Sequence, residues 1–136
     1  MTDTLTLLRG VVAATPFDVW MGLELVEAAE GRALVRLVSR PDLLQQSGFL
    51  HAGVIAALID RAAGFAAASS VGAVLTCNFQ VTPYRPAVGD IFEASAQVVR
   101  AGKIQAFVNI ELFAISGDNR KLAAGGTSIL AVLGQG

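Results

Sequence analysis

Apolar residues recur along the chain with two different periods, which divide it into helices and strands. Residues 3–15 place leucine and valine at roughly helical spacing, and Pro16 ends this predicted helix. From residue 21 to 38 apolar and polar positions alternate on either side of Glu30 and Gly31, which indicates a β-hairpin. Residues 41–50 are expected to form a loop, and residues 52–70, rich in Ala, Leu and Ile without proline, favour one long helix.

After Gly72 the alternating pattern returns and continues almost to the last residue. Four strands are expected over residues 74–82, 91–100, 104–115 and 121–133. Because short turns join neighbouring strands in antiparallel fashion, the sequence predicts an α+β fold with the long helix on one face of a mainly antiparallel sheet. No repeat or linker interrupts the chain, so residues 1–136 are expected to form one domain, with an N-terminal helical segment (1–19) and a core (20–133).

Charge is scarce in this sequence and is nearly absent from its centre. Only 15% of the residues are Asp, Glu, Lys or Arg, against about 25% in typical domains. Between Asp42 and Arg85 the only charged residues are Asp60 and Arg61. Adjacent helical residues do not face each other, so Arg61 is expected to reach solvent. Asp60 is then either a functional carboxylate or a member of a structural ion pair, since a buried lone carboxylate is costly.

The composition excludes several classes of protein. A net charge of -1 with scattered arginines gives no basic face for nucleic acid, and 54% hydrophobic residues exclude disorder. Asp60 and Arg61 interrupt the best apolar stretch, which argues against a membrane span, and the N-terminus lacks the basic lead of a secretory signal. The single cysteine, Cys77, fits a reducing cytoplasm. A chain this small and apolar is expected to bury part of its surface in a homo-oligomer.

The loop before the long helix carries the first candidate chemistry. His51 is the only histidine, and without neighbouring ligands a metal site is not expected. His51 is either a loop histidine bonded to backbone or an acid/base group. Gly48 and Gly53 flank it, and a glycine-bearing loop that runs into a helix presents backbone N–H groups that can polarise a carbonyl oxygen.

The strand after that helix carries the second set of polar residues. Thr76, Asn78 and Gln80 alternate with Leu75, Cys77 and Phe79. They are therefore expected to share one strand face, either a solvated face or the floor of a cleft between subunits. Cys77 has no base nearby in the sequence, and no Gly-x-Ser-x-Gly motif occurs, so a serine or cysteine nucleophile is not favoured.

Residues 45–60, which read QQSGFLHAGVIAALID, resemble a known signature. They are similar to the Asn-x-x-Gly-x-x-His-Gly-Gly-x6-Asp pattern of hotdog-fold thioesterases of the phenylacetic-acid-degradation (PaaI-like) type. The later Arg85-Pro86-Ala87 and Gly102-Lys103 also match this family, and the resemblance covers roughly residues 20–133. Gln45 stands where the family has Asn, and Ala52 replaces the first Gly of the pair.

The resemblance implies a curved antiparallel sheet wrapped around one helix, in dimers and often tetramers, with the active site at the dimer interface. Asp60 would act as general base or as nucleophile on a thioester, and N–H groups of Ala52 or Gly53 would stabilise the oxyanion. Gln45 would orient the water or the carbonyl, and Thr76 falls where the family often has a Ser or Thr from the other subunit. The remaining candidates on this motif are His51 as a catalytic residue and Gly48 as a substrate contact.

The expected reaction is hydrolysis of a medium-sized or aromatic acyl-CoA, with coenzyme A as part of the substrate and no separate cofactor. Asn78 is a candidate substrate contact, and Arg85, Arg100 and Lys103 are the available cations for the nucleotide end, or else ordinary surface charges. Two alternatives remain open. One is a non-catalytic acyl-CoA-binding protein, and the other is a hydratase or dehydratase on the same fold, which the His51 context favours less.

Overall fold

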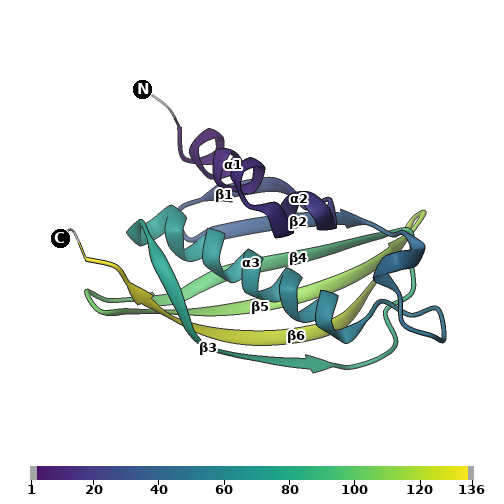
Figure 1. Ribbon diagram of the computed structural model, residues 1–136. Helices are drawn as coiled ribbons and strands as arrows, with labels where there is room; N and C mark the ends of the chain where they lie inside the picture. The colour runs from purple at the N-terminus through teal and green to yellow at the C-terminus, as the bar shows by residue number, and fades with distance from the viewer. Residues whose placement is uncertain (1–2, 135–136) are drawn as a thin grey trace.

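A computed structural model describes residues 3–134 and confirms the predicted α+β fold. Figure 1 shows the order of the elements along the chain. They are α1 (Thr4–Ala14), α2 (Pro16–Met21), β1 (Glu24–Ala29), β2 (Arg32–Val38), a short 3-10 helix (Pro41–Leu43), α3 (Ala52–Val71), β3 (Val74–Pro83), β4 (Ile91–Ala101), β5 (Gln105–Ser116) and β6 (Asn119–Val132).

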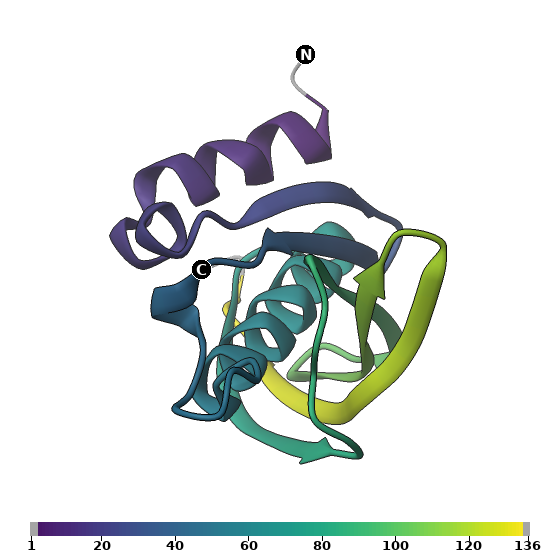
Figure 2. The same cartoon turned by 90° about the vertical axis from the view of Figure 1, so that its right-hand side faces the viewer.

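The strands form one antiparallel sheet in the order β1-β2-β4-β5-β6-β3. The sheet curves around α3 (Figures 1 and 2). This helix follows β2 in the chain and leads to β3, the strand at the edge opposite β1. This is the hotdog arrangement. The hairpin between β1 and β2 turns at Glu30 (φ 53°) and Gly31 (φ 81°), and two positive φ angles in a two-residue loop are typical of a type I′ turn.

The core lies between α3 and the concave face of the sheet. Seven of the buried α3 side chains are Ile55, Leu58, Ile59, Ala62, Ala63, Ala66 and Ala67. The alanines allow the sheet to approach the helix closely, and the predicted inward alternation of β2 is confirmed by the burial of Ala33, Val35 and Leu37. By length and composition alone α3 is able to cross a membrane, but in this structure it is the helix that the sheet encloses.

The two edges of the sheet differ in what covers them. α1 lies along β1 (Figure 2), where the Arg9 guanidinium donates to the carbonyl oxygens of Leu25 (3.0 Å) and Val26 (3.3 Å). At the other edge, β3 pairs only with β6 within the described chain. An unpaired strand edge is a ready surface for another strand, so the fold has one covered edge and one open edge.

Two local features are the second N-terminal helix and a buried carboxylate on β4. The first helix ends at Ala14, before Pro16, as the sequence pattern predicts. Pro16 also begins a second helix, α2, which the pattern does not predict, because proline suits the first position of a helix. On β4, the buried carboxylate of Glu93 accepts hydrogen bonds from Arg36 and Arg120 at 2.7 Å each. These two arginines connect β2, β4 and β6 through one carboxylate.

Candidate active site

Asp60 lies in the middle of α3 and is held by a hydroxyl group. The Thr76 hydroxyl of β3 donates to Asp60 Oδ1 at 2.8 Å, which joins the two predicted residues in one contact. No described residue donates to Asp60 Oδ2. Both residues line a groove of about 720 Å³ that also borders α1. A half-buried carboxylate with one oxygen fixed and the other free is suited to accept a proton from water.

The Thr76 contact with Asp60 lies within one protomer, and the family-based expectation that Thr76 serves the site of another subunit stays a prediction. The register of β3 explains the geometry. A β-bulge between Thr76 and Asn78 shifts the pairing with β6, so that Thr76 pairs with Leu130 and Asn78 pairs with Ile129. Because paired residues share a face, and Leu130 is in the core, Thr76 faces α3.

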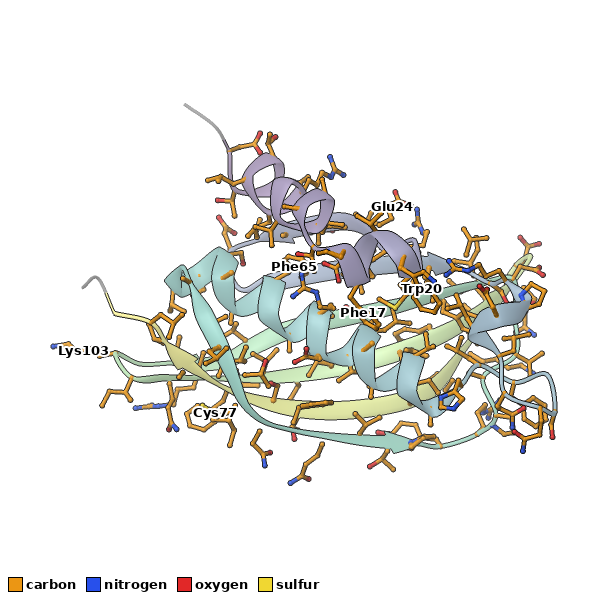
Figure 3. The ribbon with its side chains drawn as sticks, in the orientation of Figure 1. Phe17, Trp20, Glu24, Phe65, Cys77 and Lys103 are labelled. Atoms are coloured by element: carbon orange, nitrogen blue, oxygen red, sulfur yellow. The ribbon has the colours of Figure 1, made fainter. Side chains whose placement is uncertain are left out.

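The same bulge overturns the prediction that Thr76, Asn78 and Gln80 share one face. Asn78 and Gln80 point to the outer side of the sheet and are exposed, whereas Thr76 points inward. Cys77 occupies the bulge and its exposed thiol extends away from α3 (Figure 3). An extra residue in one strand reverses the alternation that follows it. Asn78 is therefore not placed beside Asp60.

The start of α3 forms a second cluster. His51 is its N-cap, and His51 Nδ1 accepts the Gly53 N–H at 2.8 Å. The next two N–H groups, of Val54 and Ile55, donate to the His51 carbonyl oxygen. Of the first four helical N–H groups only that of Ala52 has no acceptor among the described residues. Ala52 therefore keeps an N–H that can bond an outside acceptor, whereas the Gly53 N–H is engaged by the ring of His51.

Gln45 and Gly48 shape the loop that leads to this helix. Gln45 Oε1 accepts the N–H groups of Ser47 and Phe49, so its oxygen stabilises its own turn. Gly48 adopts φ 85°, a conformation that side chains disfavour. Gln45, Phe49 and Ala52 line a pocket of about 360 Å³ at the helix start. The predicted loop residues are therefore together, although the Gln45 oxygen is already engaged.

The two clusters lie apart within one chain. Asp60 follows Ala52 by eight residues of continuous helix, which corresponds to about 12 Å along the helix axis. A thioester carbon within about 3.5 Å of a water on Asp60 therefore cannot place its oxygen on the Ala52 N–H of the same chain. Within one protomer the Asp60–Thr76 pair and the Ala52 N–H are therefore two separate clusters.

The sequence predicts that Arg61 reaches solvent, but the structure places its guanidinium in an ion pair. Its guanidinium donates to Asp18 Oδ2 through Nη2 (2.5 Å) and Nε (3.1 Å), and it stacks over the Phe65 ring at 4.6 Å. Asp18 is fully buried, and its Oδ1 has no partner among the described residues. The helix that carries Asp18, α2, is not among the elements predicted from the sequence. Its signal was present, because Pro16 followed by Asp18 is the proline and first-turn acid pattern of a helix start.

The predicted cations separate to opposite ends of the molecule. Arg85 lines the pocket beside Ala52 and also a neighbouring cleft of about 540 Å³, which it shares with Lys121, a residue that the sequence pattern does not single out. Arg100 is the penultimate residue of β4 and Lys103 lies in the following turn, at the other end of the sheet (Figure 3). Residues 3–134 hold no group of three or more potential metal ligands.

Comparison with known proteins places these features in a family. The family described as the thioesterase superfamily matches residues 47–120, more than half of the chain. The chain belongs to the thioesterase superfamily. Its fold and its neighbours identify it more closely as a PaaI-like hotdog thioesterase, as the loop and helix signature predicted.

Two solved structures and one curated protein illustrate the similarity. A thioesterase family protein from Silicibacter pomeroyi superposes with a TM-score of 0.90 at 30% identity, over 95% of this chain and 97% of that one. A variant of the phenylacetic acid degradation protein PaaI from Thermus thermophilus has a TM-score of 0.78 at 29% identity, over 88% and 100%. A candidate esterase from Halobacterium salinarum is 33% identical over 91 residues, which are 61% of this chain and 60% of that protein.

Proposed function

We propose that this chain is an acyl-CoA thioesterase that hydrolyses a medium-sized or aromatic acyl-CoA to the free acid and coenzyme A. The observation that carries the proposal is the Asp60–Thr76 contact, which fixes a carboxylate in the middle of α3, beside a groove. Membership of the thioesterase superfamily supports the hydrolase class. The proposed location is the cytoplasm.

In the proposed reaction Asp60 Oδ2 takes a proton from water, and the oxygen of that water attacks the thioester carbon. The carbonyl oxygen becomes an oxyanion, which accepts the Ala52 N–H, and collapse of the intermediate expels the coenzyme A thiolate. The thiolate then takes the proton. Alternatively, the Asp60 carboxylate attacks the carbon directly and expels the coenzyme A thiolate, and water then hydrolyses the resulting anhydride to the free acid and the Asp60 carboxylate. The Thr76 hydroxyl keeps Oδ1 occupied in either route, which directs the reaction to Oδ2.

The active unit in this proposal is a dimer, with a tetramer as the expected assembly. Ala52 and Asp60 of one chain are eight residues apart, or about 12 Å along the helix, so the oxyanion donor and the base for one thioester come from two protomers. The open edge of β3 supports such an assembly, because a two-fold axis near the middle of this strand would pair it with its copy. That pairing would bring the Thr76 end of one β3 to the Pro83 end of the other.

Coenzyme A would lie at the start of α3 in this arrangement. Arg85 lines both the pocket beside Ala52 and the adjoining cleft, and Lys121 lines that cleft. The two cations are therefore the proposed contacts for the phosphates. Arg100 and Lys103, at the far end of the sheet, would reach the same nucleotide only from the partner. No further cofactor is proposed.

Thiol release from a panel of acyl-CoAs tests the carboxylate. The exposed Cys77 would react with a disulfide reagent, so the assay is best performed in a Cys77→Ser background. Asp60→Asn should lower kcat by about 10²- to 10⁴-fold, the usual contribution of a general base. Asp118→Asn, an exposed carboxylate in the last turn, is the matched control and should retain activity. Robust turnover in Asp60→Asn would refute this mechanism.

Ala52→Pro tests the oxyanion donor without breaking the helix. Ala52 is the first residue of α3 and His51 before it is extended (φ -61°, ψ 137°), so proline fits the backbone and removes only the N–H. The expected loss in kcat is about 10²- to 10³-fold. Ala52→Ser, which keeps the N–H, is the control and should stay near wild type.

Mixing the two inactive variants tests the shared site. A heterodimer of Asp60→Asn and Ala52→Pro has one site with both defects and one with none. Random mixing should therefore restore about a quarter of wild-type activity. If base and donor act within one chain, every site keeps one defect and the mixture stays inactive.

A non-catalytic acyl-CoA-binding protein is the second candidate, and one observation favours it. The Gln45 oxygen is bonded to its own loop and is not available to orient water. Tight acyl-CoA binding by wild type without any thiol release would support this alternative over the thioesterase.

A further inference from the structure

The groove that contains Asp60 continues along α3 toward the end of that helix. Its volume is about 720 Å³, within the range of small-molecule sites. The α3 positions that line it run from Asp60 to Ala68, a stripe about 12 Å long at the rise of an α-helix. Charge is confined to one end, at Asp60 and Arg61, and the far end is formed by small and apolar residues such as Ala68 and Val74. The shape suits an elongated apolar group with its reactive end at Asp60.

The opposite wall of this groove comes from α1. Leu7, Leu8 and Val11, together with Thr4, line it at helical spacing. Leu8 also packs against the core, but Leu7 is 61% exposed and Val11 is 44% exposed. An apolar ligand in the groove would remove both side chains from water, which is favourable in proportion to the area covered.

The buried pair formed by Asp18 and Arg61 fixes this wall relative to the catalytic carboxylate. Asp18 belongs to α2, which follows α1 directly, and Arg61 is the residue next to Asp60. Their hydrogen bonds are the side-chain bonds that tie α2 to α3 in the described structure. Any movement of α1 and α2 away from α3 would have to break them and would expose a buried carboxylate.

We infer that α1 is a specificity wall of the substrate site: Leu7 and Val11 select an elongated, apolar acyl chain, and the Asp18–Arg61 pair holds the wall in position. This inference rests on the proposed function, because it takes the thioester to lie at Asp60. It adds the class of acyl group and assigns a role to the N-terminal helices, which lie outside the loop and helix that carry the family signature.

Chain-length preference in binding tests the inference separately from catalysis. Non-hydrolysable thioether analogues of butanoyl-CoA and dodecanoyl-CoA are titrated calorimetrically into wild type, Leu7→Trp and Ala13→Trp. Wild type should bind the dodecanoyl analogue more tightly. Leu7→Trp fills the groove and should reduce that preference by about tenfold or more, the scale of a misfit in an apolar pocket. Ala13, exposed on the opposite side of α1, carries the same substitution as a control and should leave the preference unchanged.

A separate variant tests the role of the Asp18–Arg61 pair. Asp18→Asn should also reduce the chain-length preference while the butanoyl analogue keeps its affinity, because the wall moves but the coenzyme A contacts do not. Equal affinity of wild type for both analogues would overturn the inference, as would a Leu7→Trp variant with unaltered preference. The alternative occupant of the groove is a second copy of the chain, and sedimentation of Leu7→Trp tests it. If the oligomer dissociates and the chain-length preference is unaltered, a second copy covers the groove. Absence of thiol release from wild type would refute only the proposed function.

Discussion

Removing Arg61 should destabilise the fold far more than removing its partner Asp18. The substitution Arg61→Met keeps an aliphatic stem over the Phe65 ring, but it takes away the only hydrogen bonds that the Asp18 carboxylate receives among the described residues. Asp18 is fully buried, and its Oδ1 already has no partner within residues 3–134. The variant therefore leaves a charged group in the interior with no compensation, which is the costly way to break a buried pair.

The size of the effect follows from the burial of the two partners. Loss of one partner from a buried pair costs about 3–5 kcal/mol, and full burial of Asp18 places Arg61→Met in that range. In Asp18→Asn the Arg61 side chain, which is 25% exposed, can turn to water. That variant loses only charged hydrogen bonds, a cost of about 1–3 kcal/mol. The double variant Asp18→Leu/Arg61→Met removes both charges and should lie within about 1 kcal/mol of wild type.

Urea unfolding followed by circular dichroism measures these differences at one fixed protomer concentration, since oligomerisation contributes to apparent stability. The single variants Asp18→Leu and Arg61→Met and the double variant form a cycle that isolates the coupling between the two side chains. The reasoning is refuted if Arg61→Met costs no more than Asp18→Asn, or if the double variant loses as much as the two single losses added together.

Two further predictions concern the sheet. Burial alone would raise the pKa of Glu93, but hydrogen bonds from its two arginine partners outweigh this and hold the pKa below its ordinary value of 4.5. Its stabilising effect is therefore present above that value and lost as the pH falls through the folded-state pKa, so Glu93→Gln should flatten the acid decline in unfolding free energy, and an unchanged decline would contradict this. Gly126→Ala would place a Cβ 2.6 Å from the Gln80 carbonyl oxygen, which should cost about 1–3 kcal/mol in urea unfolding. The displacement of β3 should also slow thiol release, whereas Gly10→Ala, with nothing within 4 Å, should do neither.

The sequence predicts well whatever depends on local periodicity. The alternation in β2, the long alanine-rich helix and the four C-terminal strands all follow from residues that are close in the chain, and the structure confirms them. Such features need no knowledge of distant contacts, because each residue's environment repeats every two or 3.6 positions.

The misplaced residues all depend on contacts between distant segments. The alternation of β3 alone puts Asn78 on the face of Thr76, but the bulge that separates them is a property of the pairing with β6. Arg61 is expected in solvent from the sequence, because its partner Asp18 precedes it by 43 residues and reaches it only through the packing of α2 on α3. For the same reason, the sequence could name Asp60 and Thr76 as separate candidates without predicting their hydrogen bond.

These contacts explain why the centre of the sequence is nearly uncharged. α3 must be apolar where the sheet encloses it, so a charge on this helix is tolerated only at positions where a polar partner or solvent meets it. Asp60 and Arg61 occupy two such positions about 100° apart around the helix, and they take different partners, Thr76 and Asp18. Asp60 Oδ2 therefore stays without a donor among the described residues, while the neighbouring Arg61 holds α2 against α3. In the proposed mechanism the helix also separates Asp60 from Ala52, so the geometry that isolates the base within one chain is also what makes a second chain necessary for catalysis.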